Sequence, residues 1–129
     1  MELIRWANEY LPERLRVPDT GEQVFNGLAL FRLAEAIKGK PMEPPVPDTA
    51  FPSGPDDDRF DGLFKLFDFF LTNDIRMGNV SINDVKQGRK DKIVQILRAL
   101  RSWEEKRKNI ARSIGRSGAH VGPFMTLEA

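Results

Sequence analysis

A twelve-residue segment near the middle of the chain is dense in large apolar side chains. The segment Phe60–Leu71 contains five of the nine phenylalanines and three leucines. These residues recur at the i, i+3, i+4, i+7 spacing of an α-helix, and burying each is worth roughly 1.5 to 3 kcal/mol. We therefore expect a central helix, apolar over most of its circumference, that buries Phe60, Leu63, Phe64, Phe67, Phe70 and Leu71 and carries Leu66 and Phe69 on its flanks. The preceding run Asp56 to Asp58 is expected to cap the first turn.

Two further long helices are predicted before this segment. Residues 1–11 have apolar side chains at helical spacing and end at Pro12, which cannot continue a helix. The pair Asn26-Gly27 is expected to begin the next helix, and Gly39 is expected to end it.

After the central segment, Ser81 and Asp84 predict a capping box that opens a short helix ending at Gly88. The last helix is expected to start near Arg89. Its buried stripe is predicted to be Ile93, Ile96, Leu97, Leu100 and Trp103. No segment alternates as a strand does, so the predicted fold class is all-α, with four main helices and short connecting helices.

The segment from Lys40 to Pro55 contains six prolines, which exclude a regular helix or a central strand. We interpret it as a long ordered loop over the core, anchored by Phe51. A polyproline II segment that an SH3-like groove reads is the alternative.

The composition narrows the class of protein. The 129 residues suit one domain, and the absence of cysteine excludes thiol chemistry and disulfides, as is usual for a cytoplasmic protein. No segment reads as a membrane span. The single histidine, His120, lies in a glycine-containing tail, and no phosphate-binding loop is present, so we expect no enzyme, no catalytic residues, no metal site and no cofactor.

Charge is distributed unevenly along the chain. Residues 1–88 contain ten Lys and Arg against fifteen Asp and Glu, whereas residues 89–129 contain ten against four. The basic end is interpreted as a solvated helical tail, as a contact for an acidic partner, or as a clamp on the acidic residues 1–88. Since no base-reading module or aromatic platform accompanies it, no specific nucleic-acid binding is expected.

Four segments, in order, resemble the calponin homology family, in a single copy over roughly residues 2–104. They are Leu3-Ile-Arg-Trp-Ala-Asn8, Asn26-Gly-Leu-Ala-Leu-Phe-Arg-Leu33, Phe64 to Asp74, and Ser81-Ile-Asn-Asp-Val-Lys-Gln-Gly88 followed by Lys92-Ile-Val-Gln-Ile-Leu-Arg-Ala-Leu100. Asn26 stands where the family usually has Asp, and either residue can cap a helix. The chain is thus divided into a calponin-homology-like domain (1–104), a basic extension of the last helix (105–114) and a flexible tail (115–129).

The resemblance implies a cytoskeletal interaction module of a larger protein that binds filaments or acts as an adaptor. Actin is favoured over microtubules. The family's actin-facing surface maps to Arg5, Asn8 and Glu9 on the first helix and to Arg98 and Arg101 on the last. The basic residues Lys106, Arg107 and Lys108 are further candidates, because both filaments are acidic.

A second interpretation is docking of an acidic, calmodulin-like regulatory partner on the last helix. Ile96, Trp103 and Ile110 are each seven residues apart, the spacing of helix-in-groove anchors. Because Ile96 and Trp103 also belong to the predicted core, such binding would require the last helix to detach.

Overall fold

The computed structural model describes residues 2–20 and 22–121, with side chains as far as residue 111. The described chain forms five α-helices, α1 (Glu2–Tyr10), α2 (Gly27–Lys38), α3 (Asp61–Thr72), α4 (Ile82–Lys86) and α5 (Lys90–Val121), and two 3-10 turns, Glu13–Leu15 and Asp48–Ala50. These residues contain no strand, so the all-α prediction is confirmed.

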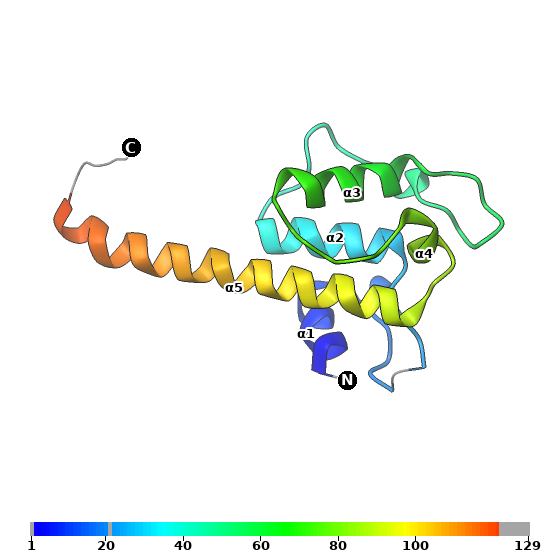
Figure 1. The fold of residues 1–129 in the computed structure, drawn as a ribbon, viewed down its shortest axis with the longest axis horizontal. Helices are drawn as coiled ribbons and strands as arrows, with labels where there is room; N and C mark the ends of the chain where they lie inside the picture. The colour runs from blue at the N-terminus through cyan, green and yellow to red at the C-terminus, as the bar shows by residue number, and fades with distance from the viewer. Residues whose placement is uncertain (1, 21, 122–129) are drawn as a thin grey trace.

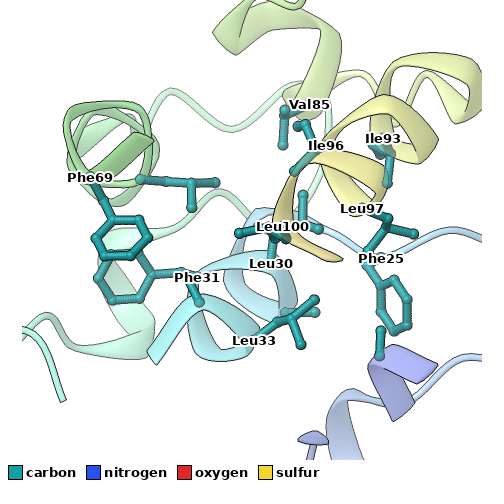
Figure 2. Packing of buried hydrophobic residues seen from close by; sticks show 14 of the residues in the cluster. Phe25, Leu30, Phe31, Leu33, Phe69, Val85, Ile93, Ile96, Leu97 and Leu100 are labelled. Atoms are coloured by element: carbon teal, nitrogen blue, oxygen red, sulfur yellow. The ribbon is translucent and has the colours of Figure 1, made fainter. Parts of the chain in front are cut away.

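Helices α2 and α3 run side by side, and α5 passes along the other side of α2 (Figure 1). Helix α1 contacts both α2 and α5, and the short α4 joins α3 to α5 at one end. The residues between α2 and α5 form the middle of the core. Figure 2 shows Ile96, Leu97 and Leu100 of α5 together with Leu30 of α2 and Phe25, and all five are almost completely buried.

The structure confirms the caps that were predicted for α2 and α4. The side chain of Asn26 accepts a hydrogen bond from the Ala29 N–H at the start of α2, and Gly39 ends that helix in the left-handed conformation with φ 88°. Ser81 and Asp84 form the expected capping box of α4, and Gly88 follows with φ 70°.

The buried face of α3 differs from the prediction. Leu63, Leu66 and Phe70 are buried, with Phe69 beside them, whereas Phe64 is 52% exposed and Leu71 is 80% exposed. The prediction that Phe64 and Leu71 are buried is therefore wrong. Phe60 and Phe67, from the same expected stripe, are only partly buried.

The position of Phe51 explains which face of α3 turns inward. Its ring is buried beside that of Phe31, as expected for the anchor of the proline-rich loop. A Cβ on Gly62 would lie 2.6 Å from the Phe51 ring, and a Cβ on Gly27 would lie 2.4 Å from the Leu63 side chain. The two glycines therefore allow the loop and α2 to approach α3 closely, and they fix its inner face on the side of Gly62 and Leu63.

The expected capping of α3 by the acidic run is also wrong. Phe60 occupies the N-cap position without a side-chain hydrogen bond. Asp57 instead accepts hydrogen bonds from the backbone N–H and the hydroxyl of Ser53, and it pairs with Arg59. The Arg59 guanidinium holds the pKa of Asp57 well below its usual range. Asp57 thus stabilises the loop before α3.

Helix α5 continues past the body of the domain to Val121, beyond residue 114 where we expected it to end (Figure 1). The division into a domain at 1–104, an extension at 105–114 and a tail at 115–129 stays a prediction, and residues 122–129 lie outside the described part. None of the described helices combines the length and the apolar character that crossing a bilayer requires.

We predict that two identical substitutions in α3 have different effects on stability. Phe70→Ala should cost about 3 to 5 kcal/mol, because it opens a cavity at a side chain that is 1% exposed. Phe64→Ala should cost about 1 kcal/mol or less, because the half-exposed ring loses only its stacked contact with Phe60. Urea denaturation of both variants at low protein concentration measures the difference, and equal losses would contradict the described face of α3.

Candidate functional site

An open groove of about 670 Å³ lies where α1 meets the middle of α5. Both polar and apolar groups line it, and its basic side chains come from α5. The lining residues are Glu2, Leu3, Arg98, Arg101, Ser102, Glu105, Lys106 and Asn109.

Helix α1 is held against α5 by apolar packing and by one buried carboxylate. Ile4 and Ala7 are buried between the helices. Glu104 of α5 is only 6% exposed, and it accepts hydrogen bonds from the Trp6 indole N–H at 3.1 Å and from the Tyr10 hydroxyl. Lys108 lies 3.6 Å away and partly balances the charge. We call Glu104, Trp6 and Tyr10 the Glu104 clamp.

The clamp changes the proton affinity of both acids in it. Burial alone would raise the pKa of Glu104, but the hydrogen bonds from Tyr10 and Trp6, with the charge of Lys108, lower it below its usual value. Burial, the hydrogen bond to Glu104 and the negative charges of Glu104 and Glu9 together raise the pKa of Tyr10 to about 12. At neutral pH the carboxylate is therefore ionised and the phenol is protonated.

The basic side chains of the groove differ in how they are held. Arg101 pairs with Glu2 at 3.2 Å and lies over the Trp6 ring at 6.0 Å, so it is oriented by α1. Arg98 and Lys106 are exposed, and neither forms an ion pair with another described residue. These two side chains are the cations that the groove offers to a ligand.

The candidates on α1 lie in a separate depression. Arg5, Asn8 and Glu9 line it together with residues of the connector after the 3-10 turn Glu13–Leu15. Asn8 is occupied by the fold, because its amide donates to the Val17 carbonyl at 2.8 Å and its oxygen accepts from the Val17 N–H at 3.2 Å. Arg5 pairs with Asp19 at 2.6 Å. The structure therefore does not bring these residues into the groove that contains Arg98 and Arg101.

The side chains of Lys106, Arg107 and Lys108, which are consecutive in α5, have different neighbours. Successive residues of a helix are about 100° apart. Lys106 lines the groove, Lys108 faces Glu104, and the Arg107 guanidinium lies 4.8 Å from the Trp103 ring centroid and donates to the Lys38 carbonyl at 3.3 Å. If the basic end packed onto the acidic residues 1–88, these side chains would pair with carboxylates there. Within the described residues, none of the three does so.

The three anchors expected for a calmodulin-like partner do not share an exposed face. Ile96 is fully buried, and Trp103 packs edge-to-face on Phe69 with ring centroids 5.2 Å apart. Trp103 is partly buried, and Ile110, at 59% exposed, is the one strongly exposed anchor of the three. Docking through all three would require α5 to leave the core.

Sequence reasoning missed Glu104, which is absent from the predicted buried stripe of the last helix. Glu104 follows Leu97 by seven residues and Leu100 by four, so it extends the buried stripe of α5. Two features of the sequence could have identified the Glu104 clamp. One is an acid at a stripe position of the last helix, and the other is the presence of Trp6 and Tyr10, two aromatic residues with polar hydrogens, on the first predicted helix.

The comparisons with known proteins give no relative: no family model, no curated protein and no solved structure matches the chain.

We predict that the tyrosine absorbance titrates at abnormally high pH. Tyr10 is the only tyrosine, so the signal at alkaline pH reports this residue alone. Because its pKa is raised from 10.0 to about 12, the stabilisation by this phenol is complete below pH 10 and is lost as the pH rises through 12.

The matching variant is Glu104→Gln, which removes the charge but keeps an acceptor oxygen. It should move the midpoint of the titration toward 10, and the chain unfolded in guanidinium should titrate near 10. A midpoint near 10 in the folded wild-type protein would show that the clamp is not formed in solution.

Proposed function

We propose that the chain is a calponin-homology-like interaction domain that binds an acidic cytoskeletal filament, actin in preference to microtubules, through the groove between α1 and α5. In this proposal it acts in the cytoplasm as a filament-binding or adaptor part of a larger protein. The observation that carries the proposal is the pair of exposed cations, Arg98 and Lys106, on a groove whose shape α1 fixes.

The order of the helices supports the calponin-homology-like assignment. The four segments that resemble the family correspond, in sequence, to α1, α2, α3 and the pair α4–α5. The first and last of these segments each contribute one residue to the lining of the groove, Leu3 and Arg98. Actin is preferred because two positions of the family's actin-facing surface, Arg98 and Arg101, fall in this groove.

The charge of the groove supports an acidic ligand. Arg98 and Lys106 lie on α5, the helix that begins the basic end of the chain. Exposed cations attract a negatively charged polymer over about 8 Å at physiological ionic strength and farther at lower salt. Binding through this groove should therefore weaken as salt is added.

The test is co-sedimentation of the full chain with F-actin and, in parallel, with microtubules, at two salt concentrations. Arg98→Glu should weaken actin binding about fivefold, since reversal replaces an attraction by a repulsion worth together about 1 kcal/mol. Lys90→Glu is the matched control. Lys90, like Arg98, is an exposed cation of α5 without a described ion pair, but it lies at the first residue of the helix, away from the groove.

Three results would contradict the proposal. Absence of the chain from both pellets at tens of micromolar would exclude filament binding. Equal effects of the two substitutions would place the contact outside the groove. Binding to microtubules but not to actin would refute the stated preference.

A further inference from the structure

The outer face of α3 carries an apolar stripe that the described residues leave partly exposed; at its first residue, the Lys86 ammonium lies 4.8 Å from the Phe60 ring centroid. Phe60, Phe64, Phe67 and Leu71 follow one another at the i, i+4, i+7 and i+11 spacing of a single helical face. Phe64 and Leu71 are 52% and 80% exposed, and the other two are partly buried. We call these four residues the α3 stripe.

Only three large apolar side chains are strongly exposed among the residues with described side chains, and the α3 stripe contains two of them. The third is Ile110, on the part of α5 that continues beyond the body of the domain. Lys106 and Arg107 precede Ile110 by four and three residues, so they flank it on the same side of the helix.

The end of the α3 stripe formed by Phe64 and Leu71 and the surface around Ile110 carry charges of opposite sign. Asp68 lies between Phe64 and Leu71, four residues after one and three before the other, and Asp61 lies one turn before Phe64. Both carboxylates are exposed, and within the described residues neither forms an ion pair. Two cations also lie near the stripe: Lys65 is on the same helix, and the Lys86 ammonium lies over the Phe60 ring. Asp68 is nevertheless the charged residue at helical spacing from both Phe64 and Leu71, whereas cations flank Ile110.

One molecule cannot join these surfaces by itself. Helix α5 is continuous to Val121 and leads away from the body, so its extension does not turn back over α3 (Figure 1). Two molecules related by a two-fold axis can satisfy both surfaces of both copies at once, since each supplies one α3 and one extension.

We propose that the α3 stripe is a docking site for the basic extension of α5 from a second copy of this chain, with Ile110 packed against Phe64 and Leu71 and Lys106 beside Asp68. The result is a reciprocal dimer. The exposed apolar area is small by the standard of stable interfaces, and the charged contacts are at the surface, so association is weak and salt-sensitive.

The test is sedimentation velocity of the full chain from about ten micromolar to about one millimolar at low salt. The expected result is a mass that rises from one toward two copies with concentration and falls again when salt is added. Ile110→Ser and the double variant Phe64→Ser/Leu71→Ser should each abolish the rise. A wild-type chain that stays monomeric over the whole range would overturn the proposal.

The same variants exclude other pairings. If Ile110→Ser leaves the association intact while the α3 variant abolishes it, two α3 stripes pair with each other and the proposal is wrong. If only Ile110→Ser abolishes it, two extensions pair with each other and the proposal is equally wrong.

A charge exchange gives the sharpest evidence. Asp68→Lys and Lys106→Glu should each weaken self-association, because each places like charges at both contacts of the dimer. An equimolar mixture of the two variants should associate as the wild type does, since each contact then joins opposite charges. Lys90→Glu is the control and should behave as wild type. A mixture that remains as weak as its components would show that Lys106 does not meet Asp68.

Discussion

The buried carboxylate of Glu104 determines how α1 and α5 fit together. A nine-residue helix such as α1 is marginal by itself, so its position depends on what it packs against. Ile4 and Ala7 supply apolar contact, and the hydrogen bonds of Trp6 and Tyr10 to Glu104 select one rotation and one height along α5. An ionised carboxylate is tolerated at this depth because it accepts two hydrogen bonds and lies close to Lys108.

The groove is a consequence of that fit. With α1 fixed, Glu2 reaches Arg101 and Leu3 forms part of the wall, while Arg98 and Lys106 remain in solvent. The proposed filament site therefore depends on an intact α1. It also depends on the charge state of the Glu104 clamp at neutral pH, in which Glu104 is ionised and Tyr10 is protonated. Lys106 also flanks Ile110, so the proposed filament contact and the proposed self-association involve the same turn of α5.

The positions of the helices and the caps of α2 and α4 could be predicted from the sequence because they depend on local chemistry. Asn26, Gly39 and the Ser81–Asp84 pair act on backbone groups within a few residues, so their patterns are readable without the fold. The burial of Phe51 could also be predicted, since a large aromatic side chain in a loop that lies over the core is expected to pack into it.

Neither the rotation of α3 about its axis nor the set of residues that form the candidate site could be predicted in the same way. Apolar residues surround most of α3, so periodicity does not select a face, and the choice is made by the contacts of Gly62 with Phe51 and of Gly27 with Leu63. Asn8 became a candidate from a resemblance, but its two bonds to Val17 arise from a connector whose path the sequence does not reveal. Glu104 was missed because its two partners lie more than ninety residues away in the chain.

Hydrogen–deuterium exchange of the full chain, with and without F-actin, tests the central claim most directly. The account predicts slower exchange in α1 and in residues 98–109 of α5 when the filament is present, with little change in α2 or in the proline-rich loop. Protection confined to α3 or to residues 40–55, with unchanged exchange in α1 and α5, would show that the groove beside the Glu104 clamp is not the binding surface.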